Sequence, residues 1–188
     1  MFSHAFKIIT KDDTSIHFLS YGNALLSATR LAKKRVWVHA YVISANLSMQ
    51  SDPVTLFMSI LRDRRAKGVD VRFILDSPYE NRPNYHCNKV FLRLFMEWKF
   101  QFCTPPRNIT SHGKAVLIDN AVLFLGSHNL AKSSLTNPLD FTVEFRNEFL
   151  IQSFAETYQM IWQDGSMVSY KPKDIPAAPF CGYSKWQK

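Results

Sequence analysis

The amino-acid sequence predicts an α/β protein with a mixed, largely parallel β-sheet that is flanked by helices. Two buried strands, at residues 36–43 and 69–75, are separated by a helical segment at 51–67, which is the order of a βαβ unit. A hairpin at 113–127 and a closing helix at 147–163 add to this unit. The chain has 188 residues, 46% of them hydrophobic, which is enough to form the core of a single domain.

The first half of the chain has the clearest element boundaries. Residues 5–19 predict two short strands around a Lys-Asp-Asp turn, and apolar residues recur at helical spacing over 23–34. Asp52 precedes Pro53, so a side chain that caps free N–H groups is followed by a residue that has none. This pair predicts the start of a helix, and Gly68 predicts the end of the same helix.

The second half of the chain supplies the remaining elements. The hairpin turns at Asp119 and Asn120, a pair of residues that is common in tight turns. The other predicted elements are a loop at 77–85, a helix at 86–97, a strand at 98–103, a loop at 104–111 and a strand at 140–145. Together these elements form one domain over residues 1–165, and a basic, proline-containing tail follows over 166–188.

The charge balance favours a polyanionic partner. The chain has 23 lysines and arginines against 15 aspartates and glutamates, a net charge of +8 with neutral histidines. This excess suits nucleic acid or an anionic membrane surface, and the count alone does not choose between them. No apolar run has the length of a membrane span, and the start carries no secretory signal, so we expect a cytoplasmic protein without stable membrane insertion. Cys87, Cys103 and Cys181 are then expected to be free thiols.

Residues 111–130 contain the pattern H-x-K-x4-D-x6-G-S-x-N. Six fixed residue types at these spacings match by chance about once in several hundred thousand chains of this length. The pattern is therefore a specific signal for a functional site. Its members are His112, Lys114, Asp119, Gly126, Ser127 and Asn129.

Strand alternation predicts how these side chains meet. His112 and Lys114 project from one face of a strand, roughly 7 Å apart. A two-residue turn beginning at Asp119 places Ser127 opposite His112, and Asn129 follows on the same side. An imidazole, an ammonium, a hydroxyl and a carboxamide then converge on a small volume. A turn of odd length would break this register.

A fixed positive charge surrounded by neutral donors suits a phosphate group. Lys114 and Asn129 bind the non-bridging oxygens, and the neutral imidazole of His112 attacks phosphorus. A divalent cation fits poorly because Lys114 would repel it and no cage of carboxylates is present. The sequence therefore predicts chemistry with no metal and no other cofactor.

The motif resembles the H-K-D motif of the phospholipase D superfamily, and its single copy in a short chain is similar to the small bacterial nuclease branch. Residues 62–76 resemble the helix-Gly-Val-strand-Asp unit of that family, and 153–165 resemble its closing helix, so the resemblance covers about residues 20–165. It implies a phospholipase D-like fold and a phosphodiesterase activity. It also implies that Asp119 is structural and that Ser127 is a supporting donor to the phosphate.

The family also has an acidic residue after the motif that orients the catalytic histidine. The corresponding stretch, NPLDFTVEF, departs from the usual Asn-x-Glu-Asn pattern. Asp140 is the preferred candidate, although it is displaced by one position. Glu144 lies on the same predicted strand face and remains an alternative.

Phosphohistidine chemistry needs a second group that protonates the leaving oxygen. One copy of the motif therefore predicts a two-fold homodimer in which His112 of each subunit faces the other. His128 is a less favoured second group, because strand alternation points it away. The leading hypothesis is a metal-independent endonuclease that acts on DNA or RNA. A lipid phosphodiesterase and a non-catalytic nucleic-acid-binding module are the alternatives.

Overall fold

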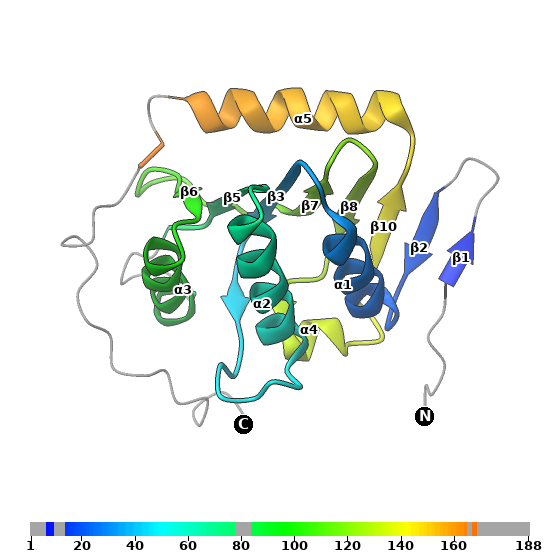
Figure 1. Cartoon of the computed structure of the whole chain (residues 1–188), viewed down its shortest axis with the longest axis horizontal. Helices are drawn as coiled ribbons and strands as arrows, with labels where there is room; N and C mark the ends of the chain where they lie inside the picture. Colours follow the sequence, from blue (N-terminus) through cyan, green and yellow to red (C-terminus); the bar gives the residue numbers. More distant parts are fainter. Residues whose placement is uncertain (1–6, 10–13, 78–83, 165–166, 169–188) are drawn as a thin grey trace.

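The computed structural model describes residues 7–9, 14–77, 84–164 and 167–168, and an eight-stranded mixed sheet lies at its centre (Figure 1). Across the sheet the strands are β1 (Lys7–Ile9), β2 (Ser15–His17), β10 (Thr142–Phe145), β8 (Val122–Gly126), β7 (Lys114–Ile118), β3 (Arg35–Ala40), β5 (Asp70–Leu75) and β6 (Gln101–Cys103). The α/β class and the mixed sheet predicted from the sequence are confirmed. The predicted tail over 166–188 falls almost entirely outside the described residues.

The first half of the chain forms the parallel part of the sheet, as its βαβ pattern predicts. Helix α2 (Pro53–Ala66) connects β3 to β5, and α3 (Tyr85–Glu97) connects β5 to β6, so both strand pairs are parallel. Helix α2 starts where the sequence indicates, because the Asp52 carboxylate accepts hydrogen bonds from the backbone N–H groups of Val54 and Thr55.

The prediction of a largely parallel sheet is wrong. Of the seven neighbouring pairs among the described strands of this sheet, the five that involve β1, β2, β7, β8 and β10 are antiparallel. The reason is local, since β7 and β8 form a hairpin and β7 enters the sheet antiparallel to β3. The parallel order of the first half therefore does not continue into the second half.

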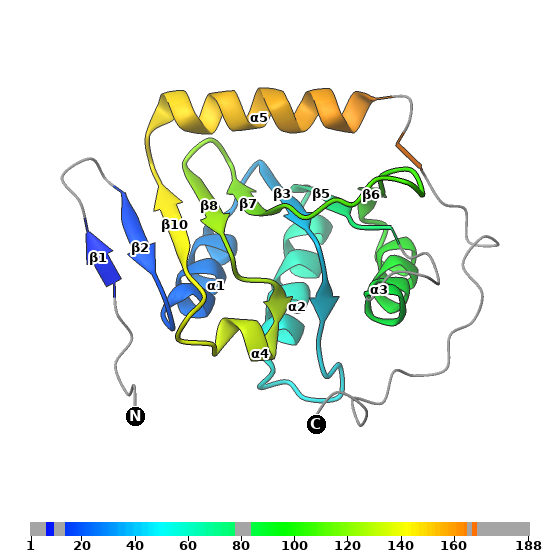
Figure 2. The same ribbon diagram turned by 180° about the vertical axis from the view of Figure 1, so that it is seen from behind.

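Helices cover both faces of the sheet. Helices α1 (Tyr21–Leu31), α2 and α3 lie together on one side, and α5 (Glu148–Gln163) runs along the top of Figure 1 (Figures 1 and 2). The α5 side forms its own apolar cluster, in which Trp37 of β3 stacks on Tyr158 at 5.0 Å between ring centroids. Because β3 is buried on both faces, its ends are rigidly placed.

A second, two-stranded sheet joins the segments that follow β3 and β8. The predicted strand at 36–43 divides into β3 and β4 (Ile43–Ser44), and β4 pairs in parallel with β9 (Leu130–Ala131). Helix α4 (Lys132–Leu135) follows β9 directly. This pairing brings the segment after β3 alongside the end of the H-K-D motif. No helix within the described residues is long and apolar enough to cross a membrane.

Candidate active site

Lys114 is the first residue of β7, and His112 lies two residues before it. The Lys114 Nζ atom lies 2.9 Å from the carbonyl oxygen of His112 and 3.3 Å from each nitrogen of its ring. His112 is exposed, and its ring packs edge-on against Tyr41 with 4.4 Å between centroids. The imidazole and the ammonium predicted to share a face thus lie side by side and open to solvent.

The hairpin does not have the predicted register. Ile118 pairs with Val122 and Val116 pairs with Phe124, so the turn has three residues, 119–121, rather than two. Asp119 adopts a positive φ of 52°, a conformation that aspartate tolerates better than most residues. Ser127 therefore does not lie opposite His112, and a continuation of the observed register brings His128 there instead.

The carboxylate of Asp119 binds the connection between α1 and β3. It accepts hydrogen bonds from the backbone N–H groups of Lys33 at 3.0 Å, Lys34 at 2.7 Å and Arg35 at 3.0 Å. The turn of the hairpin is thereby fixed to a segment that lies more than eighty residues earlier in the chain. These contacts agree with the structural role that the family resemblance implies for Asp119.

We expect Asp119→Ala to lower the free energy of unfolding by about 2 to 3 kcal/mol, because three backbone N–H groups lose a charged acceptor. Asp119→Asn should cost less, since asparagine keeps one acceptor oxygen and tolerates the same φ. Urea denaturation followed by circular dichroism measures the difference. The neighbouring exposed Asn120, changed to Ala, is the control, and equal losses at the two positions would contradict the prediction.

Ser127, Asn129 and Asp140 belong to one hydrogen-bonded network. The Ser127 hydroxyl donates to Asp140 Oδ1 at 2.9 Å, and the Ser134 hydroxyl donates to Asp140 Oδ2 at 2.7 Å. The Ser134 oxygen also accepts the backbone N–H of Asn129 at 2.9 Å. Burial alone would raise the pKa of Asp140, but the hydrogen bonds from Ser134 and Ser127 and the nearby His128 hold it below its ordinary value.

Of the two candidate acidic residues, Asp140 contacts a residue of the motif and Glu144 does not. Glu144 is buried, and it pairs with His17 at 2.8 Å and with Arg146 at 2.7 Å. Asp140 makes no hydrogen bond with His112 among the described residues. Asp140 is linked to the site by the hydrogen bond that it accepts from Ser127 and by its charge, which acts on Lys114. Partial burial lowers the pKa of Lys114, and the negative charge of Asp140 opposes this shift.

Two further histidines lie behind the exposed site. A small cavity is lined by His39, Tyr41, Lys114, His128 and Asn129 together with apolar residues of β3 and β7. The His128 Nδ1 atom lies 2.9 Å from the hydroxyl of Thr142, whereas its buried Nε2 and the Oδ1 of Asn129 have no hydrogen-bond partner among the described residues.

Sequence reasoning did not identify His39 and Tyr41 as parts of the site. The His39 ring contacts the Ser111 hydroxyl at 2.5 Å and lies against Gly113, where a Cβ atom would overlap it. Both residues stand at the C-terminal end of a parallel strand, where α/β proteins place functional side chains. That position is the signal that could have indicated them.

Both of these histidines make stability depend on pH. Burial lowers the pKa of His39, and Lys114 adds to this effect; burial also lowers the pKa of His128, against the opposing charge of Asp140. An unfolded histidine has a pKa near 6.5, whereas the pKa of each of these two histidines is lower in the folded protein. The contribution of these two histidines to the free energy of unfolding is therefore fully present above about pH 6.5 and is lost as the pH drops below it.

Thermal unfolding at pH 7.5 and pH 5.5 tests this dependence. We expect the wild type to lose Tm on acidification, and we expect His128→Gln and His39→Gln to lose less. His86→Gln, at an exposed position on α3, should behave like the wild type. An identical loss of Tm in all four proteins would contradict the assignment.

Within the described residues, no group of three or more histidine, cysteine, aspartate or glutamate side chains is placed to hold a metal ion. Cys87 and Cys103 form no disulfide within the part of the chain that the structure describes, and Cys181 lies outside it.

The sequence profile of one protein family, described as "Cardiolipin synthase, PLD-like domain", matches residues 25–162, which include the whole H-K-D motif. The chain belongs to the phospholipase D superfamily. The resemblance that the motif suggested is thus confirmed for most of the chain. A search among curated proteins finds no match.

Three solved structures share this fold. Nuc from Salmonella typhimurium, described as a phospholipase D family member, is 21% identical, with a TM-score of 0.66 over 84% of this chain and 97% of Nuc. NucT from Helicobacter pylori is 18% identical, with a TM-score of 0.63 over 84% of this chain and 98% of NucT. Phosphatidylserine synthase from Haemophilus influenzae is 11% identical, with a TM-score of 0.63 over 88% of this chain and 42% of the synthase.

Proposed function

We propose that this protein is a metal-independent phosphodiesterase of the nuclease type, which cleaves DNA or RNA through a covalent phosphohistidine at His112. The observation that carries the proposal is the exposed imidazole of His112 with the Lys114 ammonium directly beside it. Asn129 follows β8 on the neighbouring segment and supplies a neutral donor, and the Ser127 hydroxyl beside it donates to Asp140. The chain matches Nuc, which is described as a phospholipase D family member, and NucT over nearly their whole lengths, which supports the comparison with these two proteins.

The reaction follows from these groups in two steps. An unprotonated ring nitrogen of His112 attacks phosphorus, and the bond from phosphorus to the leaving oxygen breaks. A second imidazole gives its proton to that oxygen and then takes a proton from the water that cleaves the phosphorus–nitrogen bond. Lys114 and Asn129 bind the non-bridging oxygens, whose negative charge grows in both transition states. Ser127 and Asp140 position these donors.

The second imidazole comes from another copy of the chain. No other imidazole contacts the ring of His112 within the described residues, because that ring packs against Tyr41 and the ring of His128 packs against Tyr21. A two-fold dimer would bring His112 of a second copy to the same phosphorus atom. Leu139 is 82% exposed next to Asp140, and an apolar side chain at that place suits a contact between copies.

Sedimentation and activity measurements on the same samples test the dimer. Leu139→Asp should shift the protein toward the monomer and reduce cleavage in proportion, because a charge disfavours an apolar contact. Leu31→Asp, at a position on α1 that is 75% exposed, is the matched control and should change neither property. A fully active monomer would contradict the dimer.

A lipid phosphodiesterase is the second candidate, because Leu139 and Phe141 are 82% and 46% exposed on either side of Asp140. Such a pair also suits the acyl chains of a lipid. Plasmid DNA, single-stranded nucleic acid and phosphatidylcholine vesicles, each incubated with the wild type in excess EDTA, separate the two functions. We expect the nucleic acids to be cut and the lipid to remain intact. Hydrolysis of the lipid alone would favour the second candidate, and loss of cleavage in EDTA would contradict the metal-independent mechanism.

A further inference from the structure

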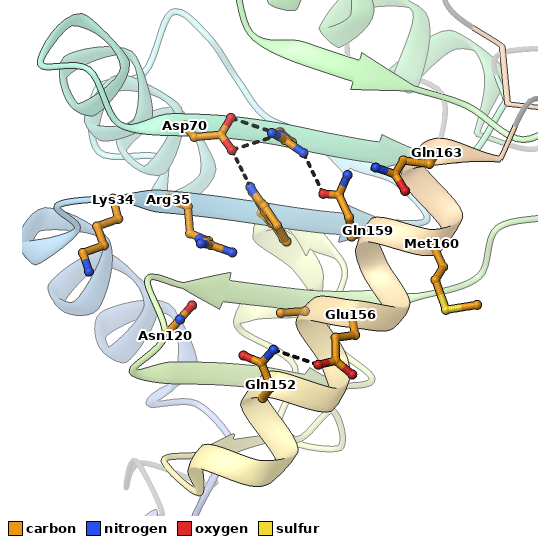
Figure 3. Close-up of a pocket in the computed structure, with 12 residues that line it drawn as sticks. Lys34, Arg35, Asp70, Asn120, Gln152, Glu156, Gln159, Met160 and Gln163 are labelled. Atoms are coloured by element: carbon orange, nitrogen blue, oxygen red, sulfur yellow. Dashed lines mark hydrogen bonds and ion pairs between the residues drawn. The ribbon is translucent and has the colours of Figure 1, made fainter.

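A wide, open pocket lies away from the H-K-D motif, between α5 and the beginnings of β3 and β5 (Figure 3). Its volume is about 820 Å³, and nine of the twelve residues that line it have polar or charged side chains. Asn120, in the turn that ends β7, lines this pocket, whereas Lys114, at the start of β7, lines the active site. The pocket and the motif therefore lie at opposite ends of the same strand.

One wall of the pocket is a polar stripe of α5. Gln152, Glu156, Gln159 and Gln163 follow one another at helical spacing and line it, as Figure 3 shows. Side-chain amides both donate and accept hydrogen bonds, so this wall can bind polar groups of either kind. The Glu156 carboxylate accepts a hydrogen bond from Gln152 at 2.8 Å.

The opposite wall carries two cations without an anionic partner. The side chains of Lys34 and Arg35 make no ion pair or hydrogen bond with any residue that the structure describes. Arg72, in contrast, pairs with Asp70 at 2.9 Å. The guanidinium of Arg35 lies 4.5 Å from the centroid of the Trp37 ring, which restricts its motion and leaves its N–H donors free.

The backbone that carries these cations is also fixed. The Asp119 carboxylate holds the N–H groups of Lys34 and Arg35 at 2.7 and 3.0 Å, and Asn120 is the next residue in that turn. Lys34, Arg35 and Asn120 thus form a set of donors with defined backbone positions. Lysine, arginine and asparagine side chains are among the groups that most often contact nucleic-acid phosphates.

We propose that this pocket binds the phosphates of a nucleic-acid strand, at a contact separate from the reaction centre. The inference rests on the nucleic-acid substrate of the proposed function and extends it to a second binding site. A single inorganic phosphate would fill only a small part of about 820 Å³. A strand, in contrast, can use both the cations of one wall and the amides of the other. The negative charge of Glu156 repels phosphates, so its removal should strengthen binding of the strand.

Binding is measured by fluorescence anisotropy in a His112→Ala background, which keeps the strand intact. In that background, Lys34→Gln with Arg35→Gln should weaken binding of an oligonucleotide of about 25 nucleotides roughly tenfold and reduce the slope of log K against log salt by about 2. An oligonucleotide of about 2 nucleotides, which is too short to reach both sites, should lose less affinity than the long strand. Glu156→Gln, at an exposed helical position, should strengthen binding of the long strand.

A matched control removes the same charge elsewhere. Arg64→Gln with Lys67→Gln takes two cations from the C-terminal end of α2 and the residue that follows it, where both pair with Asp63, and should leave the affinity and the salt slope nearly unchanged. Equal effects of the two double variants, or no effect of either, would overturn the proposal. If the wild type cuts no nucleic acid while binding still depends on Lys34 and Arg35, then the proposed cleavage fails and the binding site stands.

Discussion

His112→Ala is expected to reduce cleavage of nucleic acid by at least about 10⁴-fold, because the alanine side chain has no nucleophile to form the covalent intermediate. The fold should be retained, since His112 is exposed and precedes β7 rather than lying within it. Single-turnover cleavage of a labelled strand, together with the Tm of both proteins, measures the two effects. Acid-labile phosphate on the wild-type chain after rapid quenching would identify the intermediate directly.

His86→Ala is the control for this experiment. His86 is an exposed histidine on α3, outside the motif and outside the cavity behind it, so its removal should leave cleavage within about twofold of the wild type. Cleavage that survives His112→Ala would show that another group attacks phosphorus, and the site assignment would then be wrong.

Lys114→Ala is expected to lower kcat/KM by about 10² to 10³-fold, because it removes the fixed positive charge beside the attacking imidazole. Lys114→Arg should recover only part of this loss, since the guanidinium is wider than the ammonium and the space beside Tyr41 is small. Steady-state kinetics on one labelled strand measures all three proteins. The loss should fall mainly in kcat, because the charge on phosphorus oxygens grows in the transition state.

Lys132→Ala separates this local effect from a general loss of positive charge. Lys132 is exposed at the start of α4, close in sequence to the motif, and makes no side-chain ion pair among the described residues. We expect a small change in KM and none in kcat. If both lysine variants lost the same activity, Lys114 would act only through the net charge of the protein.

The βαβ half of the fold was predictable because its signals are local. The Asp52 cap, the proline after it and Gly68 mark the ends of α2 within a few residues, and β3 and β5 pair in parallel as that order requires. Gly68 has a φ of 88°, a value that glycine adopts without strain. Each of these features depends on neighbours in the sequence.

The hairpin register was not predictable because a distant contact decides it. A turn of two residues and a turn of three residues both fit the residues Asp119 and Asn120. The three-residue turn forms where the Asp119 carboxylate meets the N–H groups of residues 33–35, which are 84 to 86 positions earlier. A shift of one residue exchanges the two faces of a strand, so a two-residue turn predicts Ser127 at the place that His128 occupies.

The residues of the candidate site were predictable as a set. His112 and Lys114 are adjacent because only one residue separates them. Asp140 lies near Ser127 because β10 pairs with β8, an arrangement that spacing alone does not show. Tyr41 approaches His112 from β3, and no local pattern marks it.

The outermost strands of the described sheet, β1 (Lys7–Ile9) and β6 (Gln101–Cys103), are only three residues long. An added strand needs a longer row of unpaired backbone groups to attach firmly, so strands of this length discourage the growth of a continuous sheet between molecules. Beside β6, Thr104 also forms an antiparallel bridge with Val168. Within the described residues, side-chain surfaces are therefore the favoured route to self-association, and substitutions on those surfaces can tune it without disturbing the backbone hydrogen bonds of the sheet.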